Sequence, residues 1–125
     1  MVVEDGDKLR VSLVDWLEFH FPHCRIRAVE SGEAALVEVR AFCPDVVLMD
    51  VDLPGIDGIE ATRRIRSQVP STAVVILTMH DTPPHRLAAA RAGAAAYVPK
   101  HKIDQRLFPV LEKLLRARTS NRDPR

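Results

Sequence analysis

Polar side chains of the kinds used in catalysis follow several short apolar runs of this chain. These side chains are Glu4, Asp5, Asp50, Thr78 and Lys100. Three carboxylates brought close together repel one another, and each disfavours ionisation of the others. A hard divalent cation relieves that repulsion, and oxygen ligands with open positions suit Mg²⁺.

A lysine ammonium and a threonine hydroxyl beside such an ion are suited to phosphoryl oxygens. Together with a carboxylate nucleophile and Mg²⁺, Lys100 and Thr78 predict phosphoryl transfer to an aspartate. Singly, these residues have ordinary explanations, because Asp50 could form a turn and Thr78 is a common strand residue. Those explanations do not account for the five residues all falling at one edge of the parallel sheet that is predicted below.

Hydrophobic periodicity predicts strands that alternate with helices. The predicted strands cover residues 2–3, 25–29, 45–50, 72–78 and 95–99. The predicted helices cover residues 7–19, 31–41, 58–68, 82–93 and 103–116. Asp7 and Ser31 are the expected N-caps of the first two helices, and Gly93 is the expected C-cap of the fourth.

The last two predicted helices each carry an unusual feature. Pro109 lies inside the fifth, where proline costs about 3 kcal/mol, so we expect a late start near Asp104 or beyond, or a kink. The fourth helix has one large apolar residue, Leu87, followed mainly by alanines. It is therefore predicted to dock weakly and to shift on phosphorylation.

The alternation of strands and helices predicts an α/β fold with a parallel sheet covered on both sides. Ligands of such sheets bind outside the carboxyl ends of the strands. We expect a flavodoxin-like (βα)5 three-layer sandwich whose five-stranded parallel sheet has the order 2-1-3-4-5. In that order Glu4, Asp5 and Asp50 share one pocket, Thr78 lies beside them and Lys100 closes it.

The composition describes one ordinary soluble domain, with 125 residues of which 46% are hydrophobic. A net charge of +1 argues against nucleic-acid binding through bulk charge. No apolar run approaches the ~20 residues of a membrane span, and no signal peptide is evident. Cys24 and Cys43 lack metal-binding spacing and are interpreted as reduced thiols, with a single disulfide as the alternative.

These residues together resemble the receiver domain of two-component response regulators. The resemblance is carried by Glu4-Asp5, by the segment 50–55, by Thr78, and by Tyr97 three residues before Lys100. It extends from residue 2 to about 116, and segments 77–81 and 95–100 are most similar to the NarL/LuxR-type subfamily. We therefore expect a receiver (phosphoacceptor) domain over residues 1–116 and the start of a linker or tail over 117–125.

The resemblance implies that Asp50 accepts a phosphoryl group from a phosphohistidine of a sensor histidine kinase. Asp5, Asp50 and the backbone carbonyl of Asp52 would hold Mg²⁺, and Glu4 would act through a metal-bound water. Lys100 would pair with the phosphoryl group.

The resemblance also implies a switch. Thr78 would hydrogen-bond to the phosphoryl group and move inward, so that Tyr97 turns from solvent to a buried position. This change would remodel the surface formed by the fourth helix, the fifth strand and the fifth helix.

At the level of the whole protein, the resemblance implies a cytoplasmic signalling module that catalyses only its own phosphorylation and dephosphorylation. A phosphorylation-linked homodimer is plausible. DNA would be contacted only through a C-terminal helix-turn-helix output domain beyond this chain. Because only three residues precede Glu4 and a buried strand has about 5, we expect the chain to begin inside its first strand.

Two departures and two alternatives accompany this hypothesis. Glu4 stands where the family more often has Asp, and His101 follows Lys100 where the family often has Pro.

Asp50-Val51-Asp52 also matches the minimal D-x-D motif of Mg²⁺-dependent phosphohydrolases of the haloacid dehalogenase type. Those enzymes place the motif on the first strand, and Pro54 occupies a position where they have Thr or Val. A degenerate receiver that binds partners without phosphorylation is disfavoured by the complete acid, threonine and lysine set.

Overall fold

Five apolar segments pair as one parallel sheet in the order β2-β1-β3-β4-β5. The strands are β1 (Val2–Val3), β2 (Ala28–Val29), β3 (Val46–Asp50), β4 (Ala73–Thr78) and β5 (Ala96–Pro99). The computed structural model describes the backbone of residues 1–122 and the side chains of residues 1–118. The predicted strand order is confirmed, and it makes β1 and β3 neighbours.

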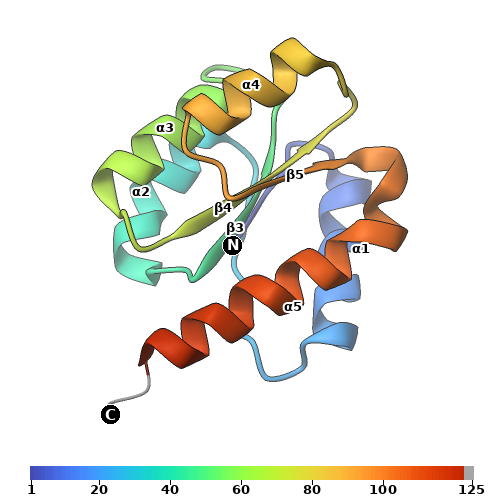
Figure 1. Ribbon diagram of the computed structural model, residues 1–125, viewed down its shortest axis with the longest axis vertical. Coiled ribbons are helices and arrows are strands. Elements are labelled where there is room, and N and C mark those ends of the chain that lie inside the picture. Colours follow the sequence, from blue (N-terminus) through green and yellow to red (C-terminus); the bar gives the residue numbers. More distant parts are fainter. Residues whose placement is uncertain (123–125) are drawn as a thin grey trace.

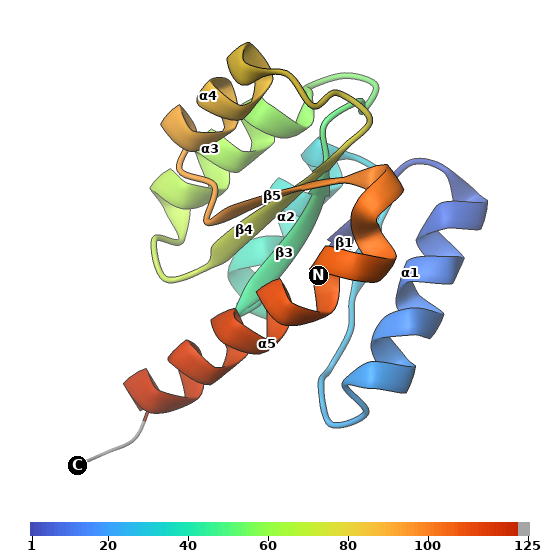
Figure 2. The ribbon, with the colours of Figure 1, turned by 45° about the vertical axis from the view of Figure 1, so that its right-hand side comes forward.

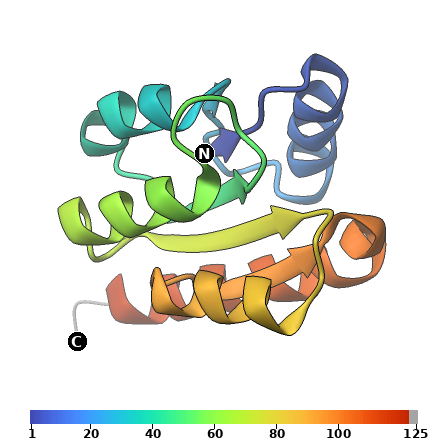
Figure 3. The same ribbon diagram turned by 90° about the horizontal axis from the view of Figure 1, so that it is seen from above.

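Helices cover both faces of this sheet (Figure 1, Figure 2). They are α1 (Asp7–His20), α2 (Gly32–Phe42), α3 (Gly58–Gln68), α4 (Pro83–Arg91) and α5 (Ile103–Arg122), with a 3₁₀ turn η1 (Lys100–Lys102) before α5. Figure 3 shows α2, α3 and α4 in succession, in the order of the strands that precede them. These three helices lie on one face and α1 and α5 on the other, so the predicted three-layer architecture is confirmed.

Two apolar clusters, one on each face, explain why the strands are continuously apolar. Neighbouring residues of a strand point to opposite faces, so Val2 packs beneath α1 and α5 while Val3 packs beneath α2 and α3. Leu48 and Met49 divide between the two clusters in the same way. Burial on both faces is the usual condition of strands in a parallel sheet.

The caps of the helices agree with the prediction in one place and differ from it by one residue in two. The side chain of Ser31 caps α2 by accepting from the backbone N–H of Ala34, as predicted. The predicted C-cap Gly93 of α4 is wrong by one residue, because the C-cap is Ala92; Gly93 follows it with a φ of +96°, a conformation that ends the helix. The predicted N-cap Asp7 is wrong by one residue, because the N-cap of α1 is Gly6. Asp7 is instead the first helical residue, where its carboxylate accepts from Arg10.

Two further element boundaries differ from the prediction. Only Ala28–Val29 of the predicted segment 25–29 pairs as a strand. The reason is that β2 pairs only with β1, which is itself two residues long. At the other end of the chain, α5 continues through Arg122, past the predicted end at residue 116, and residues 123–125 of the predicted tail lie outside the described part.

Pro109 lies in the interior of α5, because the helix begins at Ile103 directly after η1. The predicted late start is therefore wrong. Leu107 and Leu111 on either side of the proline are 0% and 3% exposed. Burying two leucines contributes about 3–6 kcal/mol, which offsets the ~3 kcal/mol cost of an interior proline.

Candidate functional site

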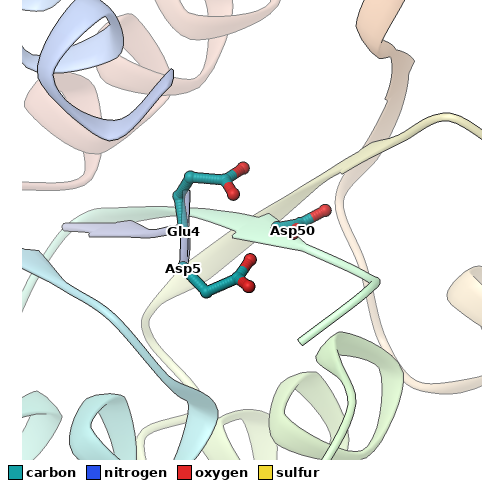
Figure 4. Close-up of side chains that lie close together, drawn as sticks. All are labelled: Glu4, Asp5 and Asp50. Carbon is teal, nitrogen blue, oxygen red and sulfur yellow. The ribbon is translucent and has the colours of Figure 1, made fainter. Parts of the chain in front are cut away.

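Three carboxylates converge at the carboxyl edge of the sheet (Figure 4). Glu4 directly follows β1, Asp50 ends the neighbouring strand β3, and Asp5 begins the loop to α1. One oxygen of each carboxylate lies within 4.8 Å of the other two. Glu4 and Asp50 are buried, whereas Asp5 is exposed. The structure thus brings together the three acidic residues that the sequence singled out.

Lys100 reaches this cluster from the end of β5, on the far side of β4. Its Nζ lies 3.0 Å from Oδ1 of Asp50 and 3.2 Å from Oε1 of Glu4. Burial acts to lower the pKa of Lys100, but the hydrogen bond and charge of Asp50, together with the charge of Glu4, raise it overall. The lysine is therefore a fixed cation that partly balances the carboxylates.

The Glu4 carboxylate is held by groups on both sides. Its Oε2 accepts a hydrogen bond from the backbone N–H of Gly6 at 3.0 Å. Burial is the main cause that raises the pKa of Glu4, and the charge of Asp50 adds to it. The Gly6 amide and Lys100 oppose the rise without cancelling it. Ionised Glu4 is thus less favourable in the fold than in water.

Thr78 and Tyr97 lie on the two strands beyond β3. Thr78 is fully buried at the end of β4, and its Oγ1 accepts from the backbone N–H of His80 at 2.9 Å. The phenol of Tyr97 donates to the backbone carbonyl of His80. Burial raises the pKa of Tyr97, and its hydrogen bond with Thr78 opposes this rise. His80 therefore connects the two residues predicted to switch.

Contacts between the loops after β3 and β4 were not found from the sequence. The backbone N–H of Asp52 donates to Oδ1 of Asp50 at 3.4 Å. Nε2 of His80 lies 3.3 Å from Oδ2 of Asp52, and the ring of His85 stacks on that of His80 with centroids 4.9 Å apart. The only available signal was that Asp52 and His80 each stand two residues after a predicted site residue.

Arg10 and Gly58 are two further supports of the site. Nη1 of Arg10 donates to the backbone carbonyl of Glu4 at 3.1 Å, which fixes the turn between β1 and α1. A Cβ at Gly58 would lie 2.0 Å from the carbonyl oxygen of Asp50, so the start of α3 packs directly against the end of β3. The sequence identified Gly58 only as the first residue of the predicted helix over 58–68.

The sequence profile described as the response regulator receiver domain matches residues 1–112. The chain belongs to this family. Receiver domains are signalling modules of two-component systems, in which phosphorylation operates a switch, and they bind Mg²⁺ at an acidic pocket. In this chain the acidic pocket is the cluster of Glu4, Asp5 and Asp50.

Individual relatives agree with this assignment. The response regulator GacA of Pseudomonas viridiflava is 38% identical over 100 residues, which are 80% of this chain and 47% of GacA. This receiver domain chain thus spans about half the length of the curated relatives it matches.

Solved structures of receiver domains also superimpose on the chain. A LuxR-family response regulator from Aurantimonas sp. SI85-9A1 has a TM-score of 0.87 at 32% identity, covering 94% of this chain and 84% of that one. The BeF3-activated DrrB receiver domain has a TM-score of 0.81 at 30% identity, covering 92% and 94%. The predicted similarity to NarL/LuxR-type regulators is confirmed. No helix in the described part of the receiver is long and apolar enough to cross a bilayer.

Proposed function

We propose that this receiver domain is a phosphorylation-dependent switch in which Asp50 accepts a phosphoryl group from a phosphohistidine of a sensor histidine kinase. One observation carries the proposal. Asp50 is only 2% exposed, yet its carboxylate lies 3.0 Å from the Lys100 ammonium and among two other carboxylates. A buried carboxylate with a fixed cation at the rim of a sheet is positioned for nucleophilic attack.

In the proposed reaction an oxygen of Asp50 forms a bond to phosphorus as the bond between phosphorus and the histidine nitrogen breaks. The product is an acylphosphate on Asp50 and a free histidine on the kinase. Lys100 pairs with the Asp50 carboxylate before the reaction, and its ammonium then pairs with the phosphoryl oxygens. The chain catalyses only this transfer and the later hydrolysis of its own acylphosphate.

The donor set of the acidic cluster suits Mg²⁺, because it consists of carboxylate oxygens and has an exposed member, Asp5, on its solvent side. Asp5, Asp50 and the backbone carbonyl of Asp52 would hold the ion, and Glu4 would act through a metal-bound water. When bound, Mg²⁺ neutralises charge on the phosphoryl oxygens. Burial and the charge of Asp50 raise the pKa of Glu4, so a cation at the cluster would favour its ionised form.

The switch follows from the hydrogen bonds around His80. Thr78 accepts from the His80 backbone N–H, and Tyr97 donates to the His80 carbonyl. We propose that Thr78 turns to hydrogen-bond the phosphoryl group, and that Tyr97 moves to a more buried position as the segment containing His80 shifts. The surface formed by α4, β5 and α5 changes as a result.

The proposed output lies outside this chain. We infer a receiver over residues 1–116 followed by a linker or tail that starts within 117–125. DNA would be bound only through a C-terminal helix-turn-helix domain, and the phosphorylated receiver would form a homodimer in the cytoplasm. GacA, in which the matched region is 47% of the protein, leaves room for such a domain.

The decisive experiment treats the chain with acetyl phosphate and Mg²⁺ and measures intact mass. We expect one added phosphoryl group, its absence without Mg²⁺, and its absence in Asp50→Asn. Asp45→Asn is the matched control, because Asp45 lies at the opposite edge of the sheet, directly before β3. Phosphorylation of Asp50→Asn to the extent seen in the unmodified chain would contradict the proposal.

A second measurement separates the switch from the phosphohydrolase considered from the D-x-D motif. Repeated turnover of p-nitrophenyl phosphate would be the behaviour of the hydrolase. We expect instead a single stoichiometric modification of the receiver, without sustained release of p-nitrophenol.

A further inference from the structure

The loop between β3 and α3, residues 51–57, is held by the start of helix α2 (Figure 3). Oε2 of Glu33, in the first turn of α2, accepts a hydrogen bond from the backbone N–H of Ile56 at 3.0 Å. Among the described residues, no other hydrogen bond joins segment 53–57 to an element that precedes β3. Glu33 is therefore the polar link between this loop and α2.

The start of α2 also packs directly on the loop. A Cβ at Gly32 would lie 2.8 Å from Cγ1 of Ile56. Gly55 has a φ of +76°, and a Cβ at this position would clash with the carboxylate of Glu33. The two glycines thus allow Glu33 to approach the backbone of the loop closely.

The Glu33 carboxylate is well suited to hold a backbone amide. The hydrogen bond from Ile56 is the main cause that lowers the pKa of Glu33, and the N–H of Glu33 itself and the charge of Arg64 act in the same direction. The carboxylate is therefore ionised at neutral pH, and hydrogen bonds to an ionised acceptor are stronger than those between neutral groups. A negative charge in the first turn is also favoured by the dipole of α2.

The same loop carries Asp52, whose backbone carbonyl is a ligand of Mg²⁺ in the proposed function. No donor in the described part of the chain forms a hydrogen bond with this carbonyl, so its direction depends on the path of the loop. At one end, the N–H of Asp52 lies 3.4 Å from Oδ1 of Asp50. At the other end, the N–H of Gly58 donates to the carbonyl of Val51 at 2.9 Å. Between these two points the loop is held through Ile56.

We propose that Glu33 is a positioning residue for Mg²⁺, which holds loop 51–57 in the path that presents the Asp52 carbonyl to the ion. This inference rests on the proposed function, because it takes that carbonyl as a ligand. A loop that is already fixed loses little conformational freedom when the ion binds, so its affinity for Mg²⁺ is higher than that of a loop released from α2.

The test measures the dissociation constant of Mg²⁺ from the unphosphorylated full chain by isothermal titration calorimetry. Groups that orient a metal ligand directly change metal affinity by about 10–100-fold, and Glu33 acts one step further out, so we expect Glu33→Ala to raise the constant about three- to tenfold. Glu33→Gln keeps an oxygen acceptor and should raise it less than about twofold. Glu38→Ala is the matched control, since Glu38 lies on the same helix and pairs with Arg27.

Hydrogen exchange of the Ile56 amide gives a second measurement that needs no metal. We expect this amide to exchange at least about tenfold faster in Glu33→Ala than in the unmodified chain or in Glu33→Gln.

Phosphorylation by acetyl phosphate separates positioning from a general loss of structure. In Glu33→Ala the Mg²⁺ concentration for half-maximal rate should rise by the same factor as the dissociation constant, while the rate at saturating Mg²⁺ stays within about twofold. Equal Mg²⁺ dissociation constants in Glu33→Ala and the unmodified chain would overturn the proposal, and so would a Glu33→Gln variant as weak as Glu33→Ala. An unmodified chain that binds no Mg²⁺ and gains no phosphoryl group would instead contradict the proposed function, and the positioning role with it.

Discussion

Glu4 lies between a repelling neighbour, Asp50, and an attracting one, Lys100. Burial and Asp50 raise its pKa above the ordinary value of 4.5. A carboxyl group with a raised pKa favours the folded state fully below its unfolded pKa, and that contribution is lost as the pH rises through the folded pKa. Without Mg²⁺, Glu4 therefore weakens the fold at neutral pH.

Glu4→Gln tests this electrostatic cost, because glutamine keeps the shape and the oxygen that accepts from Gly6 but removes the charge. We expect the variant to melt a few degrees higher than the unmodified chain at pH 7 without Mg²⁺, and at the same temperature below about pH 4. Thermal melts across this pH range are the measurement. Glu18→Gln, at an exposed glutamate of α1, should show no such trend. A variant less stable than the unmodified chain at pH 7 would contradict the argument.

Nε2 of His80 lies 3.3 Å from Oδ2 of Asp52, two residues after Asp50, so we expect the His80 ring to limit the access of water to Asp50. Removing its ring in His80→Ala should open a path for water, so we expect the acylphosphate to hydrolyse several-fold faster. The measurement is the decay of phosphorylated protein after acetyl phosphate is removed. His85→Ala is the control, since the His85 ring stacks on His80 and has no described contact with Asp52. Equal decay in both variants would count against a covering role for His80.

At the residue scale, it was predictable that the site residues lie close to one another, because parallel strands bring their carboxyl ends to one edge of the sheet. That logic located Glu4, Asp5, Asp50 and Lys100, which the structure brings together. It could not locate the contact of His80 with Asp52, because the course of two irregular loops has no periodic signal. The close packing of Gly58 on Asp50 was hidden for the same reason.

Helix α4 packs only weakly against the rest of the domain. Ala89 is its only buried residue, and Leu87 is 51% exposed. By contrast α3 buries Gly58, Ala61, Thr62 and Ile65. Little buried apolar area gives little resistance to local opening.

We expect the amides of α4 to exchange with solvent at least about tenfold faster than those of α3. Addition of beryllofluoride and Mg²⁺ should change the protection of α4 and leave that of α3 unchanged. Hydrogen-exchange mass spectrometry measures both. Protection of α4 that is the same with and without beryllofluoride would exclude α4 as the moving element.

Element types were predictable from apolar periodicity, whereas several boundaries depended on partners. The length of β2 is limited by β1, and no pattern within 25–29 reveals that limit. The interior position of Pro109 depends on Leu107 and Leu111 meeting the sheet, which outweighs local propensity. Tertiary contacts decided both cases.

Across the whole molecule, the two apolar clusters lie on the two faces of one sheet, so we expect both faces to unfold in a single transition. Ile65 is fully buried in the cluster beneath α2 and α3, and Trp16 packs against the opposite cluster. Ile65→Ala should cost about 2–5 kcal/mol. It should shift the fluorescence transition of Trp16, the single tryptophan, together with the far-UV circular dichroism transition.

Chemical denaturation followed by both signals tests this cooperativity. Val37→Ala is the control, because Val37 is 79% exposed on α2 and its truncation should be nearly neutral. Separate transitions for the two signals in Ile65→Ala would show that the two faces unfold independently.

The contact of Lys100 with Glu4 joins residues 96 positions apart. During synthesis the three carboxylates are therefore made before Lys100, and the acidic cluster at first lacks this cation. At about 5–20 residues per second, that delay is roughly 5–20 s. A partly made chain would hold Asp50 without the ammonium that prepares it for a phosphoryl group. Competence to receive a signal would thus arise only when almost the whole domain has been translated, which protects the proposed pathway from incomplete products.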